Sequence, residues 1–215
     1  MKRIVILGAG GLGRQVLAQL QIDFAHGIDW VIAGFLDERG PEVVPPALFY
    51  PWLGLPGDFV PAPDHLFVAA IGDPAMRERQ IAPLLEKGAE FTSVRTRCML
   101  GSRTVHGPTF FGYDVSCGVD CRIGSYGFID QDSLLGHDVE IGDYVHIAPR
   151  CVLAGQVKVG RGAVINSGAL IARGITIGDG AVVGMGAVVF HDVGAGQTVV
   201  GNPARVIFNK PATQA

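Results

Sequence analysis

The sequence predicts two folds in one chain: an N-terminal α/β Rossmann-like half-fold and a C-terminal left-handed parallel β-helix built from hexapeptide repeats. Three observations predict this combination. A glycine-rich segment follows the first apolar run, apolar residues recur at every sixth position from residue 99 to residue 189, and the chain holds 31 glycines among 215 residues. We expect a Rossmann-like domain at residues 1–95, a β-helix at residues 96–208 and a flexible tail at residues 209–215.

The N-terminal elements begin with a buried strand at residues 2–7, followed by Gly8-Ala9-Gly10-Gly11-Leu12-Gly13. This segment fits the G-x-G-x-x-G pattern, in which glycines let the backbone approach a phosphate at a helix N-terminus. We expect the helix at residues 14–25, with Val16, Leu17, Leu20 and Phe24 on one face. A second strand is expected at residues 30–36. It ends at Asp37, which can accept a hydrogen bond from a ribose hydroxyl; a tight turn without a ligand is the alternative.

The remaining N-terminal elements are shorter. Residues 40–64 are rich in proline and predict irregular structure. A third strand is expected at residues 66–71, then Gly72-Asp73-Pro74 as the start of a helix at residues 75–86, and a last strand at residues 91–94. Gly72 should face the same crevice as Gly10 and Asp37. Because there is room for only one mononucleotide-binding half, one nucleotide fits better than NAD, which argues against a redox dehydrogenase.

The C-terminal half repeats every six residues, and the positions that carry the repeat are all apolar: Met99, Val105, Phe111, Cys117, Ile123, Ile129, Leu135, Ile141, Ile147, Leu153, Val159, Ile165, Ile171, Ile177, Val183 and Val189. Three hexads close a triangular coil of 18 residues, with these side chains inside the prism. The pairs Ile123-Gly124, Ile141-Gly142, Val159-Gly160 and Ile177-Gly178 recur at that spacing, as a repeated tight corner would require. An antiparallel sheet would instead show a period of two. Cys117, Cys121 and Cys151 fall on packing positions.

Composition narrows the possible functions. The net charge of −3 argues against a nucleic-acid partner. No segment is long enough to insert into a membrane or to act as a signal peptide, and none of the four cysteines forms a CxxC pair, so we expect a cytoplasmic protein with reduced thiols. Only 17% of the residues are charged and 48% are apolar, which indicates buried contacts between subunits.

Two histidines of the middle coils are candidates for chemistry. His137 and His146 miss the interior positions, so both should lie on the outside of a coil or at a corner. Gly155 follows His137 by 18 residues and should leave an open slot beside it, one strand spacing away. A histidine near carboxylates such as Asp138 suits a general base, and a solvated surface histidine is the alternative. A zinc site shared through three histidines would imply hydration or hydrolysis, but no third histidine lies nearby and we expect no metal.

The chain resembles bacterial left-handed β-helix sugar acyltransferases, a family that includes sialic acid O-acetyltransferases and N-acetyltransferases of nucleotide-linked 4-amino sugars. The resemblance covers nearly the whole chain and rests on these segments: GAGGLGRQV near the start, FLDE at residues 35–38, AAIGDPAMR at 69–77, GHDVEIGDYVHIAP at 136–149, AGQVKVG at 154–160, VGMGAVV at 183–189 and GNPARVI at 201–207. This chain departs from the family at Leu12, where many relatives carry histidine, at Gly136, at Asp130, and at Val94-Arg95-Thr96.

The resemblance implies a role for each matching position. His137 would be the catalytic base, and Asp138 the carboxylate that raises its basicity. Contacts to acetyl-CoA would come from His146, Gly155, Ser167 and Met185. The nucleotide-linked sugar would be held by Gly10, Gly11, Leu12, Asp37, Glu38 and Gly72.

The function expected from these roles is direct acetyl transfer from acetyl-CoA to an amine or hydroxyl of a nucleotide-linked sugar, in a homotrimer whose neighbouring subunit completes the site. Three alternatives remain: O-acetylation of sialic acid or another sugar, a trimeric scaffold that binds a nucleotide sugar without catalysis, and a metal-dependent hydratase.

Overall fold

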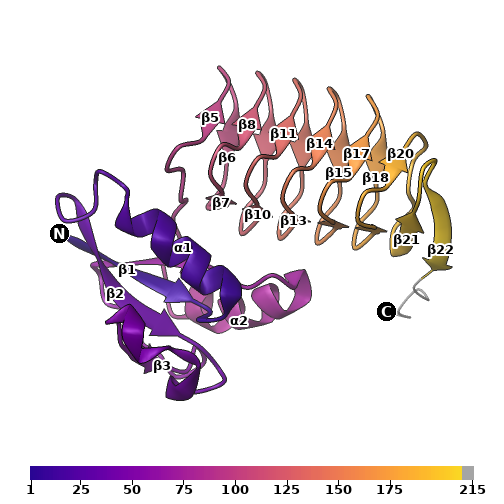
Figure 1. The fold of residues 1–215 in the computed structure, drawn as a ribbon. Coiled ribbons are helices and arrows are strands. Elements are labelled where there is room, and N and C mark those ends of the chain that lie inside the picture. The colour runs from indigo at the N-terminus through magenta and orange to yellow at the C-terminus, as the bar shows by residue number, and fades with distance from the viewer. Residues whose placement is uncertain (210–215) are drawn as a thin grey trace.

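The N-terminal part of the chain is a parallel four-stranded sheet in the order β3-β2-β1-β4 (Figure 1). The computed structural model describes residues 1–209. The strands and helices of this α/β domain are β1 (Lys2–Leu7), α1 (Gly11–Gln21), β2 (Trp30–Leu36), β3 (Trp52–Gly54), β4 (His65–Ala69) and α2 (Pro74–Glu86). Because β1 pairs with both β2 and β4, the segments that follow these three strands meet at one edge of the sheet.

Most of these elements lie where the sequence places them, with four differences. Helix α1 starts inside the glycine motif and ends at Gln21, so Phe24 lies beyond the helix and is 89% exposed. The segment expected to be irregular contains β3 and two short 3₁₀ helices, Pro41–Val43 and Pro46–Leu48. Strand β4 spans His65–Ala69 rather than residues 66–71. The strand expected at residues 91–94 is reduced to isolated bridges from Phe91 to Phe67 and from Val94 to Phe110.

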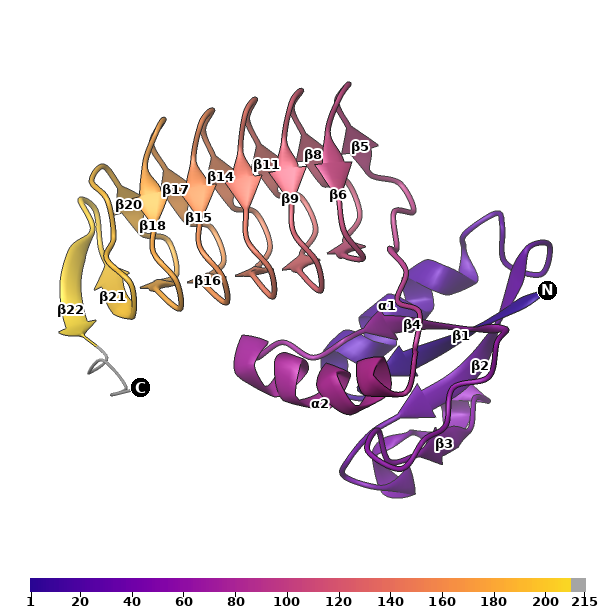
Figure 2. The same cartoon turned by 180° about the vertical axis from the view of Figure 1, so that it is seen from behind.

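The C-terminal part is a left-handed parallel β-helix whose strands, two residues long except for β21 and β22 at the C-terminal end, stack into three sheets (Figures 1 and 2). The inner sheet, which lies nearest the α/β domain, contains β7 (Phe110–Phe111), β10 (Phe128–Ile129), β13 (His146–Ile147), β16 (Val164–Ile165), β19 (Val182–Val183), β21 (Gln197–Val200) and β22 (Arg205–Asn209). The apolar sheet contains β5 (Met99–Leu100), β8 (Ser116–Cys117), β11 (Leu134–Leu135), β14 (Val152–Leu153), β17 (Leu170–Ile171) and β20 (Val188–Val189). The polar sheet contains β6 (Val105–His106), β9 (Arg122–Ile123), β12 (Glu140–Ile141), β15 (Lys158–Val159) and β18 (Thr176–Ile177).

The interior of the prism follows the six-residue repeat from Phe111 to Val189, where every repeat position is buried. The prediction is wrong for the first two positions of the repeat. Met99 and Val105 are 66% and 56% exposed, and Leu100 and His106 take their places in register with the interior residues of the next coil. The cause is one missing residue: Leu100 pairs with Cys117, 17 positions later, whereas Leu135 pairs with Leu153, 18 positions later.

The corners of the coils have a regular backbone conformation. One residue per corner takes a left-handed conformation, for example Asp132 at φ 59° and Asp138 at φ 57°. The glycines of the recurring Ile-Gly and Val-Gly pairs do not have positive φ. They are needed because coils stack closely: a Cβ added to Gly142 would lie 2.8 Å from the backbone nitrogen of Arg161 in the next coil. We expected these glycines to form tight corners. The structure shows instead that they allow adjacent coils to stack closely.

The two domains share a packed interface. Phe110 and Phe128 of the inner sheet join the same apolar cluster as Ile4 and Val16 of the α/β domain. Arg77 of α2 is fully buried and donates to the carbonyl oxygens of Ile71, Gly72, Tyr144 and Val145. These bonds tie the loop after β4 to the coil that carries β13.

The C-terminal end of the described chain is the hairpin of β21 and β22. Asn209, the first residue of the expected tail, is the last residue of β22 and pairs with Gln197. The rest of that expectation, residues 210–215, lies outside the described residues. No helix within residues 1–209 is long and apolar enough to cross a membrane.

Candidate active site

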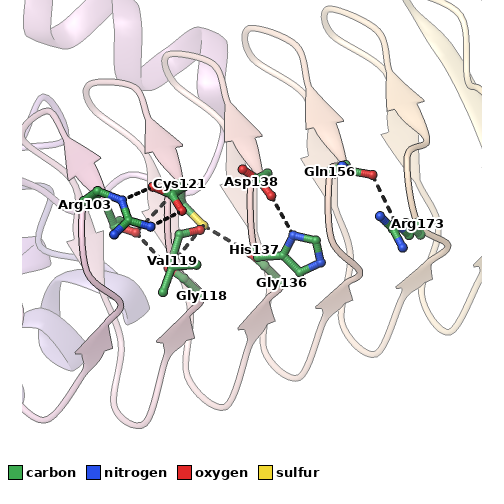
Figure 3. Close-up of polar contacts among 11 residues, drawn as sticks. Arg103, Gly118, Val119, Cys121, Gly136, His137, Asp138, Gln156 and Arg173 are labelled. Atoms are coloured by element: carbon green, nitrogen blue, oxygen red, sulfur yellow. Dashed lines mark hydrogen bonds and ion pairs between the residues drawn. The ribbon is translucent and has the colours of Figure 1, made fainter.

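His137 and Asp138 form a hydrogen-bonded pair at an exposed corner of the β-helix, between β11 and β12 (Figure 3). The distance from His137 Nδ1 to Asp138 Oδ2 is 2.6 Å. Because a carboxylate accepts, Nδ1 carries the proton and the free Nε2 presents its lone pair. The neighbouring coils hold the backbone of this corner, since Asp138 N donates to Val119 O and Gln156 N donates to His137 O. The arrangement suits a general base.

Gly155 lies directly against the His137 ring. A Cβ added to Gly155 would lie 2.6 Å from Nε2 and 2.8 Å from Cε1 of His137. The open slot expected here is therefore filled by the imidazole itself. Gly155 is needed so that the ring can lie over the next coil.

The glycine loop lies at the edge where β1, β2 and β4 end. Gly8 has a φ of 103°, and a Cβ there would lie 2.8 Å from Ala70 O, so only glycine fits. Gly11 opens α1, and nothing lies within 4 Å of the position that its Cβ would take. Helix α1 has no acidic residue in its first turn and no side-chain cap, so no carboxylate of its own offsets the positive end of the helix dipole. The approach of a phosphate to Gly10 and Gly11 stays a prediction.

Asp37 follows β2, and its carboxylate is held by donors of the protein itself. Its side chain is 4% exposed and accepts from Ala9 N at 2.8 Å and from the backbone and guanidinium of Arg39 at 2.7–3.0 Å. Burial alone would raise the pKa of Asp37, but these hydrogen bonds lower it. All of its acceptor positions are in use, so the carboxylate is not free to accept from a ribose hydroxyl.

His146 lies in the inner sheet and faces the α/β domain. A Cβ added to Gly72 would lie 3.1 Å from Leu12 Cδ1 and 3.9 Å from His146 Cε1, so these three residues meet beside the glycine loop. The ring stacks on Phe128 at 5.5 Å between centroids. Burial, with a smaller contribution from Arg77, lowers the pKa of His146 to about 4, so its imidazole is neutral at pH 7.

The other expected contacts lie at separate places. Ser167 and Met185 lie at corners between the inner and apolar sheets, Ser167 partly buried and Met185 78% exposed. The Glu38 carboxylate lies 3.4 Å from Arg79 on α2. Sequence reasoning missed Arg39, although its position two residues after Asp37 could have indicated the pairing.

The site residues therefore form two groups in one chain. His137, Asp138 and Gly155 lie at corners between the apolar and polar sheets, whereas the glycine loop, Gly72 and His146 lie on the side of the inner sheet. In Figure 1 the α/β domain lies beneath β7, β10 and β13, opposite those corners. One chain thus separates the His137–Asp138 pair from the glycine loop.

Three of the four cysteines are buried. Burial raises the pKa of the Cys117 thiol to about 12 and that of Cys151 to about 11, which agrees with packing roles. Within residues 1–209, no three histidine, cysteine or acidic side chains come close enough to share a metal ion.

Two family models match the chain: the PglD N-terminal domain at residues 3–84 and the GlmU-like C-terminal hexapeptide at residues 116–198. The chain belongs to the hexapeptide-repeat sugar acetyltransferases. No curated protein sequence matches it.

Solved structures of other proteins share the architecture of the whole chain. PerB from Caulobacter crescentus, solved with CoA and GDP-perosamine, is 25% identical with a TM-score of 0.83, covering 96% of this chain and 97% of PerB. WeeI from Acinetobacter baumannii is 28% identical with a TM-score of 0.76, covering 96% and 100%. The acetyltransferase domain of PglB from Neisseria gonorrhoeae is 22% identical with a TM-score of 0.84, covering 96% of this chain and 100% of the PglB domain. At this identity the match shows that the two chains share a fold.

Proposed function

We propose that the chain transfers the acetyl group of acetyl-CoA to an amino group of a nucleotide-linked sugar. The observation that carries the proposal is the His137–Asp138 pair, which leaves a basic nitrogen at an exposed corner. PerB, which has the same architecture, binds CoA and GDP-perosamine, a nucleotide-linked amino sugar. The glycine loop supplies a place for the nucleotide part of such a substrate.

In the proposed reaction, the amine nitrogen of the acceptor sugar attacks the thioester carbonyl of acetyl-CoA. At the same time His137 Nε2 takes a proton from this amine. The tetrahedral intermediate then collapses, the carbon–sulfur bond breaks, and CoA leaves as a thiolate that regains a proton. Asp138 holds the ring through Nδ1 and stabilises the imidazolium that forms. The reaction needs no covalent enzyme intermediate.

The backbone N–H of Gly155 is our candidate for the oxyanion donor. Within residues 1–209 it donates no hydrogen bond, whereas Gly155 O accepts from Gly174 N. It lies beside the His137 ring, where the reacting carbonyl has to be. A fixed backbone donor can stabilise the developing negative charge without reorganisation. We further propose that Gly155, Ser167 and Met185 line the path of the pantetheine arm. This path would run between two subunits, because Gly155 lies at a different edge of the prism from Ser167 and Met185.

A homotrimer would bring the two separated groups of site residues together. The outward residues of the polar sheet are mostly charged, and the inner sheet is partly covered by the α/β domain. Within residues 1–209 the apolar sheet is left uncovered: Leu134, Val152 and Leu170 lie in successive coils, Met99 lies two coils before Leu134 with Ser116 between them, and these four side chains are 37–66% exposed. Burial of this stripe against a second copy would stabilise an oligomer. Threefold symmetry would then place the His137 corner of one subunit near the glycine loop of the next.

The free thiols agree with a cytoplasmic location, which we also propose. The domain boundary at residue 95 belongs to the same proposal.

The deciding experiment measures CoA release with a thiol reagent in the presence of UDP-, GDP- and dTDP-linked amino sugars. We expect turnover with one of them and a loss of about 10²–10⁴-fold in His137→Ala, the usual range for a general base. His26→Ala, a change in a loop of the α/β domain, is the control and should keep normal turnover.

Three other outcomes of this experiment would contradict the proposal or favour another function. Normal turnover in His137→Ala would contradict the assignment of the base. Turnover only with sugars that lack the amine would favour O-acetylation. Binding of a nucleotide sugar without CoA release would favour a scaffold.

A further inference from the structure

Arg39 is held rigidly beside the glycine loop. Its Nε donates to Asp37 Oδ1 at 2.9 Å and its Nη2 donates to Asp37 Oδ2 at 2.7 Å, a two-pronged pair. Asp37 is in turn fixed by Ala9 N. The carboxylate is buried while the Arg39 side chain remains 57% exposed, so the pair anchors the guanidinium and leaves its outer edge accessible.

The outer edge of the guanidinium faces Gly10. A Cβ added to Gly10 would lie 3.3 Å from Nη2 and 3.9 Å from Nη1 of Arg39. A guanidinium has five N–H donors, and Asp37 uses two of them, which leaves both donors of Nη1 and one of Nη2. Within residues 1–209, these remaining donors have no protein acceptor within hydrogen-bond distance.

Charge explains why a cation is needed at this place. The buried Asp37 carboxylate lies beside a loop that otherwise suits an anion, and its negative charge alone would repel a phosphate. Arg39 neutralises that charge and adds directed donors next to the N-terminus of α1. The open space over Gly11 leaves room for the anion.

We propose that Arg39 binds the diphosphate of the nucleotide-linked sugar, with Asp37 as the residue that positions it. This inference rests on the proposed function and deepens it by assigning a phosphate contact. Asp37 then acts on the substrate through Arg39, not through a ribose hydroxyl.

The test is calorimetric titration of the full chain with GDP, UDP and dTDP. The diphosphate that binds the wild type most tightly is then titrated into Arg39→Gln. Hydrogen bonds to charged groups contribute about 1.5–3 kcal/mol, so we expect about 10–100-fold weaker binding. Arg39→Lys should lose less, because it keeps the charge without the planar fork. The affinity for the matching nucleoside, which lacks phosphate, should stay unchanged.

Arg3→Gln is the matched control. Arg3 makes the same two-pronged pair with Asp64, at 2.8 and 2.9 Å, but at the opposite end of β1. We expect wild-type diphosphate affinity in this variant.

Two results would overturn the inference alone: equal diphosphate affinity in Arg39→Gln and the wild type, or an equal loss for diphosphate and nucleoside. The second would show that Arg39 only shapes the loop. If the wild type binds none of the three diphosphates, the nucleotide-linked substrate of the proposed function fails together with this inference.

Discussion

His146 combines a buried imidazole with no partner for one of its nitrogens. Nδ1 is inaccessible to solvent and has no hydrogen-bond partner among the described residues. The ring packs on Phe128, and the Arg77 guanidinium adds repulsion to the effect of burial on its pKa. The histidine expected to contact acetyl-CoA therefore lies in the interface with the α/β domain, beside Gly72. In a site shared between subunits, His146 would have to contact acetyl-CoA at this interface, beside Gly72.

The neutral state of His146 predicts a pH dependence of stability. Its pKa is about 4 in the folded chain and about 6.5 when unfolded. Between these values the unfolded state binds more protons, so the free energy of unfolding should fall as the pH drops from 6.5 to 4, by at most about 3 kcal/mol. Urea unfolding across this range measures it. In His146→Gln the slope should be smaller, while the two curves run parallel above pH 7. Equal slopes in both proteins would contradict the buried neutral histidine.

Single residues differ in how far the sequence predicts their roles. The His137–Asp138 pair was expected because the two are adjacent and share one corner, and the structure joins them. The role of Asp37 was not predictable in the same way. Whether its carboxylate faces a ligand or Arg39 depends on the path of the backbone after β2, which no periodic pattern reports. Met185 and Ser167 remain expectations.

At the scale of elements, the coil period decides the geometry of the base. His137 and Gly155 are 18 residues apart, so they stack in adjacent coils, and the missing side chain of Gly155 makes room for the ring. A substitution at Gly155 therefore acts first on His137, and only then on anything that binds nearby.

We predict that Gly155→Ala lowers kcat by about 10²-fold, the effect of a displacement of roughly 1 Å in a reacting group. Gly155 has no positive φ, so alanine adds no backbone strain and the variant should fold. Steady-state kinetics of Gly155→Ala, His137→Ala and the double variant measure the effect. The double variant should be no slower than His137→Ala, because both changes remove the same group. Additive losses would show that Gly155 acts independently of His137. Gly57→Ala, where nothing lies within 4 Å, is the control.

The sequence predicts elements well where a pattern is long. From Phe111 onward the interior follows the six-residue repeat, because each coil constrains the next. The shift in the first coil is not predictable from the repeat, because Met99 and Val105 are also apolar. The residues that point inward are their neighbours Leu100 and His106. Strand β3 has only three residues in a proline-rich segment, too few to show a period.

At the scale of the whole molecule, the chain places its base and its nucleotide loop on different sides of the prism. The interface through Arg77 fixes this separation, since α2 and the coil of β13 are joined by buried hydrogen bonds. A bending motion that closes one chain on itself would have to break this packing. A second copy offers a simpler route, because the exposed stripe of the apolar sheet already provides a surface to bury.

A shared site predicts complementation between two inactive variants. Gly11→Glu should block the phosphate position by size and charge, yet fold, because nothing lies within 4 Å and an acidic residue suits the start of a helix. His137→Ala removes the base. Co-expressed chains carrying different tags would form mixed trimers, isolated by two successive affinity steps.

In those mixed trimers, a site that takes its glycine loop from a His137→Ala chain and its histidine from a Gly11→Glu chain is intact. Every cyclic trimer that contains both kinds of chain has one site of this kind among its three. We therefore expect about a third of wild-type CoA release from the isolated mixed trimers, and almost none from either variant alone. If each chain completed its own site, every site in the mixture would carry one defect and activity would stay absent. Sedimentation of the mixture serves as the control, since only assembled trimers test the geometry.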